Sequence, residues 1–167
     1  MPKVRTRRGY RYVKELGGAV RRAQPSVGAR WLTNHGMIKG RVLDFGCGFG
    51  FDADHYGWEA FDPHYRQALP EGAFDTVVCN HVLNMLTRAS RLQTLAIIQR
   101  LLGEEGIAYL IVPRNIPERG KLALRKRIQN YVRLSLPTIH EDQCLAVYAM
   151  TRHVALTDQT DEIENRM

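Results

Sequence analysis

The sequence predicts an α/β protein with a mostly parallel sheet and helices on both faces. Short apolar runs alternate along the chain with helical stretches, the pattern of a parallel sheet covered on both sides. Two apolar segments near the C-terminus, separated by residues 141–143, predict a closing antiparallel hairpin. In such sheets ligands bind beyond the carboxyl ends of the strands, where the glycines at 46, 48 and 50 follow the first apolar run.

Length and composition narrow the class of protein. The chain has 167 residues, enough for one domain, and 44% hydrophobic with 25% charged residues is ordinary for soluble proteins. Its apolar runs fall short of the roughly 20 residues that span a bilayer, and no apolar segment follows the basic N-terminus as in a signal peptide. We expect a cytoplasmic protein that does not bind membranes. Three scattered cysteines predict neither a disulfide framework nor a metal site.

Three segments divide the chain. Residues 1–25 are basic and interrupted by glycines, which predicts an N-terminal arm. Residues 26–153 hold the predicted elements of one domain, and residues 154–167 form an acidic tail that we expect to be frayed or disordered.

Each element has its own signal. Ser26 can cap a short helix that Gly36 ends. Leucines and isoleucines at helical spacing predict a helix over 90–106 that stops at Gly103 or Gly106, and a basic helix is expected over 118–132. Short apolar runs predict strands at 41–45, 58–61, 74–80 and 107–112.

The net charge of +7 is unevenly distributed. Residues 1–41 carry eleven Lys and Arg against one Glu, whereas residues 42–112 carry four Arg against nine acids. Residues 117–133 add six basic residues and one Glu. Basic ends around an acidic middle predict a polyanionic partner such as nucleic acid at 1–41 and 117–133, although basic residues that only maintain solubility would give the same pattern.

The glycine loop indicates what kind of ligand it meets. Glycines at 46, 48 and 50 let the backbone approach a ligand closely, but the dinucleotide fingerprint needs another glycine where Phe51 stands. Asp44, just before the loop, disfavours a phosphate and favours a cation. Asp62, after the second apolar run, can accept hydrogen bonds from two ribose hydroxyls. Together these residues describe an adenosine with a cationic arm.

This part of the chain resembles the class I S-adenosylmethionine-dependent methyltransferases, which have a Rossmann-like fold. The resemblance covers about residues 40–112 through three ordered motifs, "VLDFGCGFG", "FDP" and "FDTVVCNHVLNML". It implies that the loop at Gly46, Cys47 and Gly48 lines the methionine arm, that Asp62 holds the ribose, and that Asn80 and His81 face the donor methyl group. Asp44, just before the loop, is expected to be part of the same cofactor site. A narrower similarity is to methyltransferases associated with DNA phosphorothioation loci.

The chain departs from this family in two places. Only seven residues separate Gly50 from Trp58, and eleven separate Asp62 from Phe74, too few for the usual helix, strand and helix. We therefore predict a minimal, trimmed sheet that lacks one strand, the strand whose end normally contacts adenine. The stretch "NHVLN" is not the Asn/Asp-Pro-Pro-aromatic loop of amino-methyltransferases, which disfavours N-methylation of DNA bases.

Three functions are compatible with these residues. The first is S-adenosylmethionine-dependent methyl transfer to an unidentified acceptor, with nucleic acid or a substrate associated with it as the candidate acceptor and His81 as the candidate base. The second is a catalytically inactive module of the same fold that binds nucleic acid or another partner. The third is a nicotinamide-dependent oxidoreductase, which the missing glycine disfavours.

Overall fold

The computed structural model describes residues 19–123 and 127–156. The predicted arm up to residue 18 and the tail from residue 157 lie outside this range, so the domain boundaries stay predictions. Val154 and Leu156, at the end of the described chain, pack against the core.

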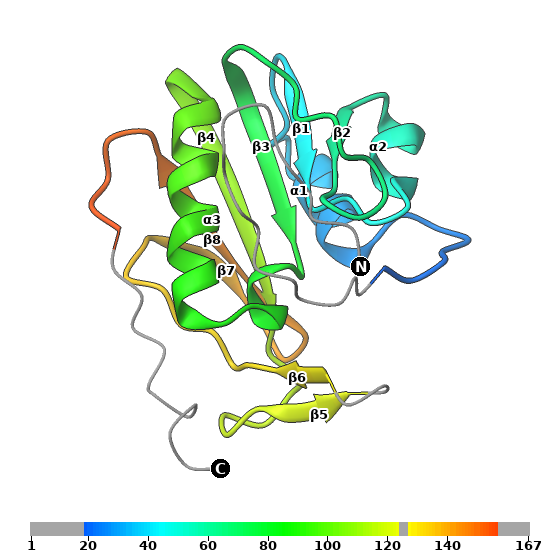
Figure 1. Ribbon diagram of the computed structural model, residues 1–167, viewed down its shortest axis with the longest axis vertical. Coiled ribbons are helices and arrows are strands. Elements are labelled where there is room, and N and C mark those ends of the chain that lie inside the picture. Colours follow the sequence, from blue (N-terminus) through cyan, green and yellow to red (C-terminus); the bar gives the residue numbers. More distant parts are fainter. Residues whose placement is uncertain (1–18, 124–126, 157–167) are drawn as a thin grey trace.

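A six-stranded mixed sheet forms the centre of the molecule (Figure 1). Its strands run in the order β2-β1-β3-β4-β8-β7. The first four are mutually parallel, β8 is antiparallel to β4, and β7 is antiparallel to β8. The strands are β1 (Val42–Phe45), β2 (Glu59–Phe61), β3 (Phe74–Asn80), β4 (Leu102–Pro113), β7 (Thr138–Glu141) and β8 (Leu145–Thr151). The predicted fold class, including the C-terminal hairpin, is confirmed.

Helices cover both faces of this sheet, and each face has its own apolar core. α3 (Arg88–Leu101) lies over one face and α1 (Val27–Asn34) over the other (Figure 1). Residues alternate along the strands between the faces, so that Leu43 and Val77 belong to the core with α3 while Val42 and Val78 belong to the core with α1. Each fully buried large side chain stabilises the fold by about 1.5–3 kcal/mol.

The predicted start and end of α1 are confirmed. The Ser26 hydroxyl accepts a hydrogen bond from the Ala29 amide at 3.1 Å and caps the helix. The amide of Gly36 donates to the carbonyl of Thr33 at 3.2 Å, after the last helical residue.

The sheet is trimmed on the β2 side, as predicted. The helix after the glycine loop, α2 (Phe51–Tyr56), has six residues. Residues 67–73 contain no helix or strand, which leaves β2 as the edge of the sheet. The strand predicted to be missing is absent from the part of the chain that the structure describes.

The predicted end of the long helix is wrong. α3 ends at Leu101, and β4 begins with the next residue instead of after Gly106. Leu102 pairs with Phe74 and Ile107 pairs with Thr76, so residues 103–106 bulge out of the ladder between these two pairs. The helix therefore stops before Gly103, a poor helix former, and pairing of Leu102 with Phe74 in β3 starts the strand there.

The predicted basic helix over 118–132 is also wrong, because a small hairpin stands there. It consists of β5 (Lys121–Ala123) and β6 (Arg127–Gln129). Gly120 has a φ of +81°, and its amide closes a turn onto the Pro117 carbonyl, which breaks any helix at this point. Beyond β6, the Asn130 amide donates to the Asn84 carbonyl at 2.7 Å and thereby ties the hairpin to the segment after β3.

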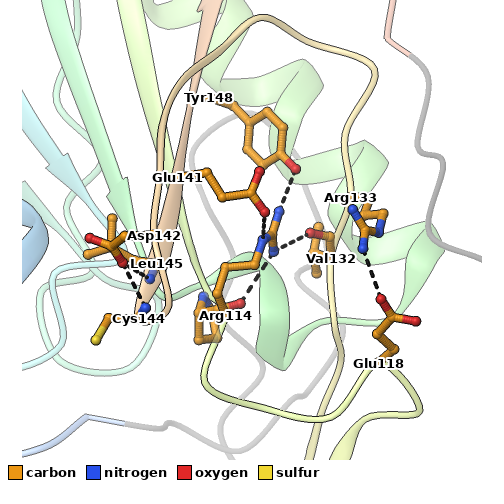
Figure 2. A network of polar contacts seen from close by, with 10 residues as sticks. Arg114, Glu118, Val132, Arg133, Glu141, Asp142, Cys144, Leu145 and Tyr148 are labelled. Atoms are coloured by element: carbon orange, nitrogen blue, oxygen red, sulfur yellow. Dashed lines mark hydrogen bonds and ion pairs between the residues drawn. The ribbon is translucent and has the colours of Figure 1, made fainter.

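A buried arginine fixes the chain where β4 ends (Figure 2). The side chain of Arg114 is 3% exposed and pairs with Glu141 at 2.8 Å. It also donates to the Tyr148 hydroxyl at 2.7 Å and to the Val132 carbonyl at 2.9 Å. These contacts join β4, β7, β8 and the segment after β6 on the carboxyl side of the sheet.

Candidate functional site

The glycine loop is fastened to the end of the neighbouring strand. The amides of Gly46 and Cys47 both donate to the Phe61 carbonyl, at 2.7 and 3.0 Å. The Gly50 amide closes the loop on the Cys47 carbonyl at 2.9 Å. The carboxyl ends of β1 and β2 are therefore held together, as the motif order implied.

The loop glycines meet three different neighbours. A Cβ on Gly46 would collide with Val82, and one on Gly50 would collide with the Arg66 guanidinium. A Cβ on Gly48 would lie 3.0 Å from the Cβ of Ala19, in the segment before α1. Gly46 is thus required by packing within the domain and Gly50 by its φ of +86° at the start of α2, whereas Gly48 lets the N-terminal segment approach the loop.

Asp62 follows β2 and organises the loop. Its Oδ2 accepts from the Gly48 amide at 2.9 Å, and its Oδ1 accepts from the amides of His64 and Tyr65 at 2.8 and 3.1 Å. Three of the roughly four lone-pair sites of the carboxylate are therefore used by the backbone. The residue lies beside the loop, where the ribose acid is predicted.

Asp44, the predicted acid before the loop, is buried at 4% exposure. Desolvation, together with the nearby charges of Asp52 and Asp62, raises its pKa to about 8, although Arg22 and Arg66 oppose the shift. At neutral pH the group is therefore mainly protonated. The negative charge predicted at this point develops fully only above pH 8 or when a cation lies beside it.

Asn80, the last residue of β3, contacts the start of α1. Its Nδ2 donates to the Ser26 hydroxyl at 2.6 Å, and the Ser26 amide donates to Asp52 Oδ1 at 2.8 Å. The side-chain oxygen of Asn80, Oδ1, is buried and has no hydrogen-bond partner among the described residues. A Cβ on Gly28 would lie 2.9 Å from this oxygen, so a glycine there lets α1 approach β3.

His81, the candidate base, has a φ of 54°, an uncommon conformation for a residue other than glycine. Its amide donates to the Ile111 carbonyl at 2.8 Å, which fixes the backbone at the end of β3. The residue as a whole is exposed, but the protein around the ring desolvates it and, with Arg22, lowers its pKa to about 4. The imidazole is therefore neutral at physiological pH. Strained residues of this kind concentrate at functional sites.

The cysteines near the site are not reactive thiolates. Desolvation and the charges of Asp44 and Asp62 raise the pKa of Cys47 to about 12, and burial raises the pKa of Cys79 as well. Among the described residues no group of His, Cys, Asp and Glu side chains could hold a metal ion. With these raised pKa values, both thiols are protonated at neutral pH.

Sequence reasoning missed Arg66, which clamps the loop onto α2. Its guanidinium pairs with both carboxylate oxygens of Asp54, at 2.8 and 2.5 Å, and donates to the Phe49 carbonyl at 3.1 Å. The Asp62 and Arg66 backbones also form an isolated bridge. The sequence holds no signal for this contact, because Arg66 stands in a stretch without regular structure.

It also missed the segment before α1. Arg21 lies over the Phe49 ring, 4.9 Å from its centroid, and Arg22 is close enough to lower the pKa of both Asp44 and His81. Sequence analysis assigned these arginines only to a basic arm. They instead lie at the loop that the predicted site residues surround.

Similarity to known proteins is found at the level of the fold and not of the sequence. No family model matches the sequence, and neither does any curated protein. Three similar solved structures cover most of their own chains and of this one. The first is the glycopeptide N-methyltransferase MtfA, with a TM-score of 0.52 and 16% identity over 77% of this chain and 97% of that chain. The second is the DhpI-SAH complex, with a TM-score of 0.50 and 14% identity over 74% of this chain and 82% of that chain. The third is Burkholderia thailandensis 1,6-didemethyltoxoflavin-N1-methyltransferase with bound S-adenosylhomocysteine, with a TM-score of 0.51 and 16% identity over 74% of this chain and 76% of that chain.

The chain therefore has the class I methyltransferase fold, in a form trimmed at one edge. The residues predicted from the motifs gather on the carboxyl side of β1, β2 and β3, at the edge where ligands bind in such sheets. Within the described residues, no helix has both the length and the apolar character needed to cross a bilayer.

Proposed function

We propose that the protein transfers a methyl group from S-adenosylmethionine. One observation carries the proposal: Asp44, the glycine loop and Asp62 lie together at the carboxyl ends of β1 and β2, on a fold shared with methyltransferases solved with S-adenosylhomocysteine. An adenosine with a cationic arm fits these groups in order: the buried Asp44 matches the cation, the glycine loop lets its backbone approach the arm, and Asp62 matches the ribose.

The proposed roles follow from these positions. Asp44 lies beneath the loop and provides a carboxylate for the sulfonium. The backbone at Gly46, Cys47 and Gly48 lines the methionine arm. Asp62 binds the ribose: one hydroxyl donates to the free lone pair of its carboxylate, and another replaces one of the backbone amides that donate to it now. Asn80 contributes its unpaired Oδ1 at the end of β3.

The transfer itself needs alignment of nucleophile, methyl carbon and sulfur more than it needs an added group. His81 stands beyond the strand end, neutral and able to take a proton from the acceptor. The electron pair of the acceptor forms the new bond to carbon while the carbon–sulfur bond breaks, and S-adenosylhomocysteine leaves.

For the acceptor, we propose nucleic acid or a substrate associated with it. The support is the charge of residues 1–41 and 117–133. Within the described part of these segments the following basic side chains are exposed: Arg21, Arg22, Arg30, Lys39, Arg41, Arg119, Lys121 and Arg133. A phosphate backbone that contacts them would give a steep salt dependence.

A second candidate is an inactive module of the same fold that binds nucleic acid or a partner. The observation that favours it is the Asp62 carboxylate, since three backbone amides already occupy it. This candidate predicts oligonucleotide binding without label transfer to any acceptor.

Methyl-labelled donor, incubated with the protein and separate pools of DNA, RNA, protein and metabolites, tests both candidates. Label in one pool, abolished by Asp62→Ala, is the expected result. Calorimetry that detects neither S-adenosylmethionine nor S-adenosylhomocysteine binding would contradict the first candidate.

A further inference from the structure

The segment from Ala19 to Arg22, called the strap below, lies across the glycine loop. We propose that the strap closes the donor site in the free protein and that the donor has to displace it to bind. This inference rests on the proposed function, because it concerns access to the same site. It makes the N-terminal segment a regulator of donor binding as well as a basic arm.

The first contact is between Ala19 and Gly48. A glycine lets its backbone come close to another group, and at Gly48 that group is Ala19, whose Cβ lies 3.0 Å from where a Cβ would stand. The φ of +57° at Gly48 is a left-handed conformation that glycine adopts without strain. A methionine arm that runs along the same backbone would need the space that Ala19 fills.

The second contact is between Arg21 and the ring of Phe49, which packs beside that of Tyr65. Phe49 and Tyr65 are 39% and 42% exposed, lie 4.5 Å apart between centroids, and flank the loop and the Asp62 turn. Arg21 lies over the Phe49 ring at 4.9 Å. A planar cationic group thus covers the apolar surface beside the predicted ribose acid.

The third contact is electrostatic. Arg22 lowers the pKa of Asp44 and also that of His81, so its positive charge is near both the acid beneath the loop and the candidate base. That is the neighbourhood in which a sulfonium would place its charge. Arg22 and a cationic donor would repel each other there, which disfavours their presence at the site together.

The chain between the strap and α1 allows such a movement. Ser26 is buried, caps α1 and is held by Asp52, so the helix is anchored at its first residue. Residues 20–24 are exposed, and residues 23–24 form a bend before Pro25. The strap can therefore leave the loop by rotation around residues 23–25 while α1 keeps its place.

Calorimetry with S-adenosylhomocysteine tests the competition. The double variant Arg21→Ala/Arg22→Ala should bind it about three- to tenfold more tightly than the wild type, because a larger fraction of molecules has the site open. Arg152→Ala is the matched control, since this exposed arginine pairs with Glu104 at 3.5 Å, at the opposite end of the sheet from the loop, and its loss should leave the affinity unchanged. Equal or weaker binding by the double variant would overturn the proposal.

A titration without ligand tests the position of the strap separately. Arg22→Ala should raise the pKa of His81, measured from the NMR shift of its ring, while Arg152→Ala should not. An unchanged His81 pKa would show that the strap does not lie at the site. If the wild type binds no S-adenosylhomocysteine but the His81 pKa rises in Arg22→Ala, the proposed function fails and the strap position is confirmed.

Discussion

The amide of Gly48 and the carboxylate of Asp62 are joined by a hydrogen bond of 2.9 Å, so the acid after β2 determines the shape of the loop after β1. The same carboxylate holds the turn at His64 and Tyr65. Asp62 therefore has a structural role in the free protein, and the ribose role proposed for it would use a group already fixed in place.

Replacement of Asp62 should affect stability and donor binding together. Asp62→Ala leaves three amides without their acceptor, at a cost of about 1–3 kcal/mol. The melting temperature should fall by several degrees, and calorimetry should no longer detect S-adenosylhomocysteine. Glu71→Ala, which removes an exposed acid nearby, should change neither. Normal donor binding by a folded Asp62→Ala protein would refute the ribose assignment.

Donor selectivity should depend on pH through Asp44. Its raised pKa of about 8 means that a cationic donor binds best after the proton has left, while neutral-sulfur S-adenosylhomocysteine has no such preference. The affinity for S-adenosylmethionine relative to S-adenosylhomocysteine should rise by up to about tenfold per pH unit below pH 8 and level off above it. The ratio should not vary with pH in Asp44→Asn. A flat ratio in the wild type would show that Asp44 does not face the sulfonium.

The free energy of unfolding should also depend on pH through Asp44, and it should fall as the pH rises. Because the folded pKa of Asp44 lies above its ordinary value of 3.8, its contribution is fully present below pH 3.8 and is lost as pH rises through 8. Asp44→Asn should therefore be more stable than the wild type at pH 9, by up to about 5 kcal/mol, with the difference shrinking toward pH 4. Urea unfolding at both pH values measures this, and an equal difference at the two would contradict it.

Loss of the buried Arg114 should destabilise the fold. Arg114→Ala leaves the Tyr148 hydroxyl and the Val132 carbonyl without their donor (Figure 2), and we expect a loss of about 1–3 kcal/mol in urea unfolding. Arg133 pairs with Glu118 on the surface and is 53% exposed, so Arg133→Ala should cost less than about 1 kcal/mol. Similar effects of the two substitutions would mean that the Arg114 network does not hold the carboxyl side of the sheet together.

Substitution of His81 should separate chemistry from donor binding. His81→Asn keeps a residue that tolerates positive φ but removes the base, so transfer should fall by at least about tenfold while the affinity for S-adenosylhomocysteine stays the same. With a pKa lowered to about 4, the wild-type rate should not decline between pH 8 and pH 6 through protonation of His81. Full activity in His81→Asn would leave alignment alone as the source of catalysis.

The sequence predicted well the features that local chemistry determines. The cap at Ser26, the strand Phe74–Asn80 and the shortened segment after Asp62 each follow from residue types at fixed spacing. The gathering of the loop and the two acids also follows, because carboxyl ends of neighbouring parallel strands meet at one edge.

The sequence failed where distant partners decide the structure. Residues 118–132 have helical composition, but Gly120 and the bond from Asn130 to Asn84 favour a hairpin. The clamp from Arg66 to Asp54 and the contact of Ala19 with Gly48 join segments with no shared pattern. The raised pKa of Asp44 could likewise not be predicted from the sequence, because it results mainly from burial in the folded protein and not from the residue type.

The strand order has a consequence for synthesis of the chain. β8 lies between β4 and β7 although it is the last strand of the sheet to be made. Before Leu145–Thr151 leaves the ribosome, β4 has an open edge and β7 has no neighbour to pair with. The interior of the sheet is therefore completed only after the last of its strands has been made, and the nascent chain must keep that edge from other partners until then.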